Sequence, residues 1–387
     1  MTPTRSSGAP PATWGASTLF VAGLVAATIG VAWWTGAAVP FRNDFAAYWP
    51  VGHLLWQGQD PYDPAAIAAL QVSVGDSLGG DSVVRYAPWA LPLLLPASLL
   101  PYQPAWYGWI VLQILLIGIS SVWLWRILGG AKAWLPLLIA FAFPPGLFVA
   151  LGGQIDGLLL IVVVAFLWAV TAGRDVAAGI CLGLMTIKPH LFLPLGLISL
   201  LWVFREHRWR LPATALFTIL AASGVALLLR PEVFSDYAEL LRTPGTSWSR
   251  PMALGTGISV LMSGRAPWLQ WLPALTLVPV IVFAWVWSGE EFAWKRDLGL
   301  VLVLGLIAAP YLLVHDLVLL LPAVLSAALC VTRWKSRGWK LTAITVFGVL
   351  CIAMWIGQVT QHHMLTNVWI APLMLIPAVL SRECIET

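Results

Sequence analysis

The sequence predicts an all-α integral membrane protein, and three observations support this. Hydrophobic residues make up 60% of the 387 residues and charged residues only 10%, against about 25% charged in soluble domains. The mean hydropathy is +0.86. The apolar residues form blocks long enough for helices, which need about 20 residues to span a bilayer, instead of the short alternating segments of a β-barrel.

We expect about twelve membrane helices in one domain, 1–387, after a flexible N-terminal lead, 1–16. The first helix, 17–39, is expected to be retained, since its apolar core exceeds that of a cleavable signal peptide. Pro189 interrupts the apolar region 176–204, which predicts two short helices meeting partway through the membrane. The expected helices cover residues 17–39, 104–127, 133–151, 154–171, 176–187, 190–204, 210–230, 268–288, 297–314, 316–331, 341–358 and 366–381.

The segment 86–101 is apolar but contains four prolines, so we interpret it as re-entrant or interfacial. An alternative topology makes it a full span and 176–204 a single kinked helix. The short basic loops favour the first topology, because it places them and both termini in the cytoplasm. These loops contain Arg126, Lys132, Arg174, Arg205, Arg208, Arg210, Lys295, Arg296, Arg333, Lys335, Arg337 and Lys340.

Two long loops, 40–103 and 231–267, then face outside, on the same side as most ionisable residues near the apolar runs. Loops longer than about 15 residues are usually functional, which predicts an active site at the outer membrane surface. The net charge is +4 and the basic residues form short clusters, so no nucleic-acid surface is indicated. The four cysteines lack metal-ligand spacing and predict no disulfide frame.

Asp44 is the first acidic residue and follows the first apolar run. Flanked by Phe45, Tyr48 and Trp49, its carboxylate would be partly desolvated, which suits a general base. The alternative is structural, since Asn43 or Asp44 could cap a following helix.

Lys188 and His190 flank Pro189 inside an apolar run. An ionisable residue there favours function, and a lysine beside freed backbone donors could bind phosphate. A lysine whose ammonium reaches the headgroups is the alternative.

Several further candidates have equally plausible structural roles. Asp156 could cap a helix or bind sugar hydroxyls together with Gln154, and Asp316 could cap while His315 holds a sugar or phosphate oxygen. Arg85 and Arg250, in aromatic-rich outer loops, are candidate phosphate or sugar contacts, although exposed loop arginines are common.

An ordered set of motifs resembles glycosyltransferase family 87, the GT-C-fold enzymes that use polyprenyl-phosphate mannose, and their relatives. The motifs are Asn43-Asp44-Phe45-x-x-Tyr48, Gly58-x-x-Pro61-Tyr62-Asp63-Pro64, Tyr86-x-Pro88, Gly153-Gln154-x-Asp156, Gly183-Leu-Met-x-x-Ile-Lys188-Pro189 and His315-Asp316-Leu-x-Leu-Leu-Leu-Leu-Pro322.

The resemblance implies a GT-C-type bundle that moves a sugar from a polyprenyl-phosphate donor to a lipid-linked or glycan acceptor. It implies Asp44 as general base, Lys188 near the donor phosphate and His315 near the reaction centre, with Tyr48 and Tyr62 among the substrate contacts. It implies no metal and no cofactor, because the leaving group is a monophosphate. The implied location is the plasma membrane of a bacterium, with the site facing outside.

Two other functions use the same residues. A transporter or flippase would place its ionisable residues near the bilayer midplane, whereas here they gather beside the long loops of one side. A non-enzymatic assembly protein of envelope polysaccharide synthesis would not need Asp44. Substituting Asp44 while measuring glycan products distinguishes these functions.

Overall fold

The computed structural model describes residues 43–75, 84–243, 253–262, 267–288, 292–359 and 368–385. Within these ranges all regular structure is helical. The lead 1–16, the expected helix 17–39 and Arg250 lie outside the described residues.

The first half of the described chain forms short helices around one long helix. Its elements are α2 (Phe45–Trp56), α3 (Pro64–Ser73), η1 (Pro88–Leu93), α4 (Leu95–Ser98), α5 (Tyr102–Ile127), α6 (Trp134–Ala142), α7 (Pro144–Leu151), α8 (Asp156–Thr171), α9 (Asp175–Met185), η2 (Pro189–Leu191) and α10 (Leu193–Glu206).

The second half contains longer helices. Its elements are α11 (Arg210–Leu229), α12 (Val233–Arg242), α13 (Leu254–Leu261), η3 (Pro267–Trp271), α14 (Leu272–Ser288), α15 (Trp294–Ala308), η4 (Asp316–Leu320), α16 (Leu321–Arg333), α17 (Arg337–Val359), α19 (Ile370–Leu373) and α20 (Leu375–Ile385).

Four helical stretches in the described residues are long and apolar enough to cross a membrane, Tyr102–Ile127, Arg210–Leu229, Val314–Arg333 and Arg337–Ile356. The bent pair α6 and α7 would make a fifth. The chain is therefore an integral membrane protein, whereas the expectation of twelve spans is not confirmed.

Proline explains where the expected helices are interrupted. The predicted break at Lys188–Pro189 is confirmed, since α9 ends at Met185 and α10 begins at Leu193. The region 133–151, expected as one helix, is instead two helices bent by 73° at Phe143. Pro144 and Pro145 lack the amide protons that would continue the helix. The segment 86–101 forms only η1 and α4, and the loop 40–103 contains short helices as expected.

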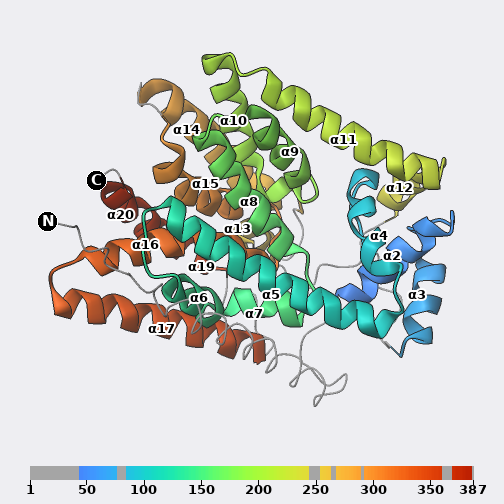
Figure 1. Cartoon of the computed structure of the whole chain (residues 1–387), viewed down its shortest axis with the longest axis horizontal. Coiled ribbons are helices and arrows are strands. Elements are labelled where there is room, and N and C mark those ends of the chain that lie inside the picture. Colours follow the sequence, from blue (N-terminus) through green and yellow to red (C-terminus); the bar gives the residue numbers. More distant parts are fainter. Residues whose placement is uncertain are drawn as a thin grey trace, which may run out of the picture.

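The arrangement places the described part of the loop 40–103 against the end of α11. Helix α11 packs along α9 and reaches α12, η1 and α2 at its far end, where α2, α3 and α4 gather (Figure 1). Arg230, which follows α11, donates from Nη1 to the Gly58 carbonyl at 3.1 Å. This contact connects the loop after α2 to the beginning of the 231–267 region.

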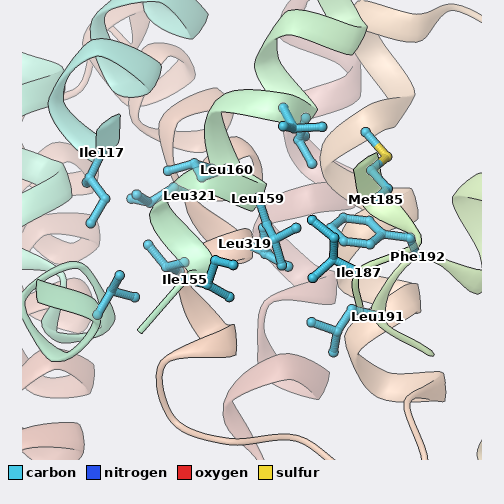
Figure 2. Close-up of a cluster of buried hydrophobic side chains, with 14 of the residues drawn as sticks. Ile117, Ile155, Leu159, Leu160, Met185, Ile187, Leu191, Phe192, Leu319 and Leu321 are labelled. Atoms are coloured by element: carbon cyan, nitrogen blue, oxygen red, sulfur yellow. The ribbon is translucent and has the colours of Figure 1, made fainter. Parts of the chain in front are cut away.

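A buried apolar cluster lies where α8, the break after α9, and η4 meet. Its side chains are fully or almost fully buried and come from these elements and from α5 (Figure 2), namely Ile117, Ile155, Leu159, Leu160, Met185, Ile187, Leu191, Phe192, Leu319 and Leu321. The polar residues Asp156, Lys188 and Asp316 lie on the same three segments. This packing fixes the backbone from which those polar side chains project.

Candidate active site

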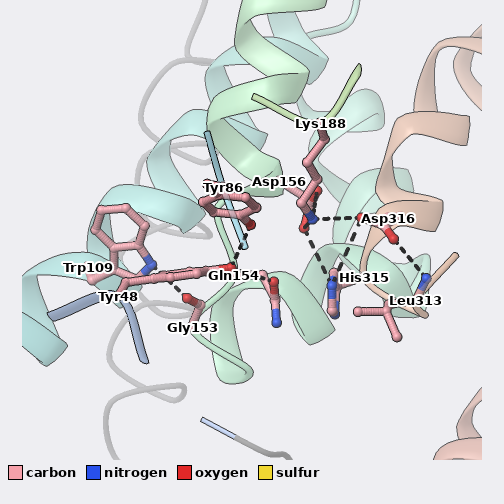
Figure 3. Close-up of polar contacts among 10 residues, drawn as sticks. All are labelled: Tyr48, Tyr86, Trp109, Gly153, Gln154, Asp156, Lys188, Leu313, His315 and Asp316. Atoms are coloured by element: carbon pink, nitrogen blue, oxygen red, sulfur yellow. Dashed lines mark hydrogen bonds and ion pairs between the residues drawn. The ribbon is translucent and has the colours of Figure 1, made fainter. Parts of the chain in front are cut away.

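Lys188 lies between two buried carboxylates from distant parts of the chain. Its ammonium is 2.8 Å and 3.0 Å from the two carboxylate oxygens of Asp156 and 2.7 Å from Oδ1 of Asp316 (Figure 3). The exposed fractions are 6% for Lys188, 0% for Asp156 and 1% for Asp316. An ammonium has three protons, so these three oxygens use all of its hydrogen-bonding capacity. We call Asp156, Lys188 and Asp316 the ion triplet.

Each member of the ion triplet sits at a helix end or break. Asp156 begins α8 and makes no capping bond with its side chain, so its carboxylate is available to Lys188. Lys188 precedes Pro189, where α9 has ended. Asp316 begins η4, and its Oδ2 accepts a hydrogen bond from the Leu313 amide at 2.7 Å. Asp316 thus combines a hydrogen bond to the preceding turn with an ion pair, whereas the capping suggested for Asp316 and for Asp156 is not observed.

Two histidines beside the ion triplet have a buried ring nitrogen without a hydrogen-bond partner among the described residues. His315 Nε2 lies 3.8 Å from Asp156 Oδ2 and 4.0 Å from Asp316 Oδ1, and it forms no hydrogen bond there. His190 packs on Tyr311 with ring centroids 3.9 Å apart, and its Nε2 is likewise without a partner in this part of the chain. Buried polar atoms in folded proteins are normally hydrogen-bonded, so these two nitrogens are suited to a ligand.

A second polar group joins the loop 40–103 to the turn before α8. The Tyr48 hydroxyl donates to Gln154 Oε1 at 2.9 Å and lies 3.1 Å from the Tyr86 hydroxyl. Tyr62, from the same loop, donates to the Tyr86 carbonyl at 2.8 Å. Gln154 is 3% exposed. Figure 3 shows Tyr48, Tyr86 and Gln154 beside the ion triplet.

Asp44 is attached to this same turn through its backbone. Its amide donates to the Gly152 carbonyl at 2.9 Å, and it stands at the N-terminus of α2 without a capping bond from its side chain. Burial raises the pKa of the Tyr48 hydroxyl well above its usual range, and the nearby Asp44 and Asp156 carboxylates raise it further. Asp44 is partly exposed. The turn 152–156 therefore connects Asp44 at its beginning with the ion triplet at its end.

Gly153 allows this close approach. Its φ is +67°, in the left-handed region that glycine adopts without strain. A Cβ at this position would lie 2.7 Å from Trp106, 2.8 Å from Phe45 and 2.9 Å from Asn43. The Trp109 indole donates to the Gly153 carbonyl at 2.9 Å, which fixes the turn further.

Comparison with known proteins shows to which family the chain belongs. The family model of glycosyltransferase family 87 matches residues 85–314, which is more than half of the chain. The chain belongs to glycosyltransferase family 87. The expected membership of this family is thereby confirmed.

One curated relative gives a further comparison. The chain is 30% identical to GPI mannosyltransferase 1 of Aspergillus oryzae (strain ATCC 42149 / RIB 40) over 193 residues, covering 45% of this chain and 43% of the relative. The chain thus matches less than half the length of this relative. No solved structure matches the chain.

Two candidate residues of this family 87 chain are not part of the site described above. Arg85 donates to the carbonyls of Leu240 and Thr243, both at 3.3 Å, at the end of α12. Its guanidinium thus stabilises a helix terminus, which is a structural role. Arg250 lies outside the described residues.

Sequence reasoning did not select Tyr86 and Tyr311 as site residues, although Tyr86 occurs in a motif and Tyr311 stands four residues before His315. Tyr86 lies between Tyr48 and the ion triplet in Figure 3. Each tyrosine stands within two residues of a proline and close to other candidate residues in the sequence. This position could have identified both.

Among the described residues, Asp156, His315 and Asp316 present ligand atoms within 4.8 Å of one another, as a metal site would require. Both carboxylates already bind the Lys188 ammonium. A divalent cation would compete with this lysine for the same oxygens, so the chain's own cation balances charge at this position.

Proposed function

We propose that this chain transfers a sugar, with mannose as the first candidate, from a polyprenyl-phosphate donor to a lipid-linked or glycan acceptor. Family membership supports sugar transfer, and the activity for which the Aspergillus relative is named supports mannose. The reaction would take place at the outer face of the membrane, in the plasma membrane of a bacterium.

The observation that carries the proposal is the hydrogen bond from the Asp44 amide to Gly152, at 2.9 Å. It holds the backbone of the partly exposed Asp44 against the turn 152–156, whose last residue, Asp156, pairs with Lys188. Asp156 and Asp316 are buried and paired with Lys188, whereas Asp44 is partly exposed, so Asp44 is the better candidate for accepting a proton from an acceptor.

In the proposed reaction, Asp44 removes the proton of an acceptor hydroxyl. The hydroxyl oxygen attacks the anomeric carbon, and the bond from that carbon to the phosphate oxygen breaks. The electron pair leaves with the polyprenyl monophosphate, and Asp44 retains the proton until release. A single displacement of this kind inverts the configuration at the anomeric carbon and needs no covalent intermediate.

The phosphate would bind at Lys188 and the two histidines. Because Asp156 accepts through both oxygens, loss of one of these bonds frees one ammonium proton while an ion pair remains. The unpartnered nitrogens of His315 and His190 would donate or accept hydrogen bonds with phosphate or sugar oxygens. Gln154 and Tyr48 would contact the acceptor side, near Asp44.

The test is an assay of the purified full chain with a panel of radiolabelled polyprenyl-phosphate sugars and lipid-linked acceptors. We expect transfer from a polyprenyl-phosphate sugar and none from the corresponding nucleotide sugar. Movement of an intact lipid or solute across a proteoliposome membrane, with no new glycosidic bond, would instead support a transporter.

A further inference from the structure

The segment 333–340, which runs from the end of α16 into the first turn of α17, concentrates positive charge and tryptophan. It contains Arg333, Lys335, Arg337 and Lys340, two tryptophans and no carboxylate. The helical stretches on either side, Val314–Arg333 and Arg337–Ile356, are both long and apolar enough to cross a membrane. The segment therefore joins the ends of two candidate spans, where lipid headgroups lie.

A shallow, open and mostly apolar hollow lies on the surface of this segment. Trp334, Lys335, Ser336 and Trp339 line a space of about 370 Å³. The exposed fraction is 37% for Trp334 and 67% for Trp339. Two indole rings beside an ammonium and a hydroxyl offer both an apolar wall and polar groups. Tryptophan is typical of the membrane–water interface for this reason.

The four cations of the segment differ in their partners. Arg333 donates to the Cys384 carbonyl, and Lys340 donates to the Thr332 carbonyl at 3.1 Å. Lys335 and Arg337 form no ion pair with a carboxylate in the part of the chain that the structure describes. Both residues are exposed. Two positive charges therefore remain available beside the hollow.

Some cations in two other basic clusters of the described chain have carboxylate partners. Arg208 is 2.8 Å from Asp175, and Asp297 lies 2.8 Å from both Arg296 and Arg382. Lys335 and Arg337 have no such carboxylate partner among the described residues. The charge at residues 333–340 is thus left to an external anion.

We propose that the hollow at Trp334, Lys335, Ser336 and Trp339 binds the headgroup of an anionic phospholipid. The phosphate oxygens would pair with Lys335 and Arg337, and the indole rings would pack on the glycerol region and the upper acyl chain. This site is separate from the proposed sugar transfer and does not depend on it.

The experiment titrates the purified full chain in detergent with phosphatidylglycerol or phosphatidylcholine and counts bound lipids by native mass spectrometry. The test variant is Lys335→Gln/Arg337→Gln, and the matched control is Arg205→Gln, which removes an exposed cation from another cluster. We expect the wild type and the control to prefer phosphatidylglycerol. The double variant should lose about thirtyfold in affinity for that lipid, since each basic residue near an anionic membrane contributes about 1 kcal/mol.

Two further measurements separate loss of charge from loss of folding. The variant Lys335→Arg/Arg337→Lys keeps both charges and should retain the preference, while thermal unfolding in the same detergent checks that every variant is folded. Equal affinity of wild type and double variant for phosphatidylglycerol would overturn the proposal. So would displacement of the lipid by inorganic phosphate at equal concentration, since the site would then recognise a soluble anion.

Discussion

The Lys188 ammonium lies 2.7 Å from Asp316 Oδ1, although the two residues are 128 positions apart in the sequence. With Asp156 on its other side, Lys188 connects the beginning of α8, the break after α9 and the beginning of η4. Three helical segments therefore share one buried ion triplet. An uncompensated charge in such a place is costly, and this leads to the first prediction.

Replacing Lys188 with Met should destabilise the protein strongly. The change leaves two buried carboxylates without a counter-ion, at a cost of about 3–5 kcal/mol. We expect a lower thermal unfolding midpoint in detergent and loss of sugar transfer. The triple variant Lys188→Met/Asp156→Asn/Asp316→Asn removes all three charges and should unfold at a higher temperature than Lys188→Met alone. A single variant as stable as the wild type would contradict the ion triplet.

Replacing Gly153 with Ala should disrupt the turn that holds Asp44. The new Cβ would meet Trp106, Phe45 and Asn43 at 2.7–2.9 Å. The alanine would also have to adopt a backbone φ of +67°. We expect reduced stability and little transfer activity.

Gly173 offers a matched control for the backbone strain alone, because its φ is +66° and nothing lies within 4 Å of an added Cβ. Gly173→Ala should cost about 1 kcal/mol, the usual penalty for a left-handed non-glycine residue. Equal effects of Gly153→Ala and Gly173→Ala would show that the close packing around the turn is unimportant.

Replacing Tyr48 with Phe tests the connection between the first outer loop and the turn. The ring and its stacking on Tyr86 remain, but the buried Gln154 Oε1 loses its donor, at a cost of about 1–3 kcal/mol. We expect a measurable decrease in the unfolding midpoint and in transfer rate. Tyr107→Phe, in α5, serves as control and should be close to neutral. Unchanged stability and turnover for Tyr48→Phe would exclude this role.

The orientation of the chain can be tested by thiol labelling of intact cells. In a Cys384→Ser background the remaining native cysteines are buried. Cysteine placed at the exposed Gln59 should react with an impermeant maleimide, because the loop 40–103 is predicted to face outside. Cysteine at the exposed Glu206 should react only after the membrane is permeabilised. The reverse pattern would place the Asp44 side in the cytoplasm.

The sequence predicted the helix break at Lys188 because proline has a local effect that can be identified from the sequence. The same reasoning applied to Pro144 and Pro145, but the apolar run 133–151 was interpreted as one helix, so the 73° bend was missed. The run is long enough to span a bilayer as one helix, which masks the effect of its prolines. The expected number of spans depends on such runs, and length alone therefore does not determine it.

The polar residues in the apolar runs are conspicuous in the sequence, but the sequence does not show how they pair. Lys188 meets Asp156 across 32 residues and Asp316 across 128, and such partners depend on how the helices pack. The sequence therefore suggested a cationic pocket at Lys188, whereas the structure places two carboxylates on the ammonium. The roles of Asp44, Lys188 and His315 in transfer stay predictions.

The most direct measurement compares wild type and Asp44→Asn for transfer of labelled mannose from polyprenyl-phosphate mannose, with unfolding midpoint and donor binding measured on the same samples. Asparagine keeps the shape and the backbone bond to Gly152 but cannot accept the proton. We expect normal folding and donor binding, with a rate lower by about 10²–10⁴, the usual contribution of a general base. Turnover at the wild-type rate in a folded Asp44→Asn protein would contradict the account.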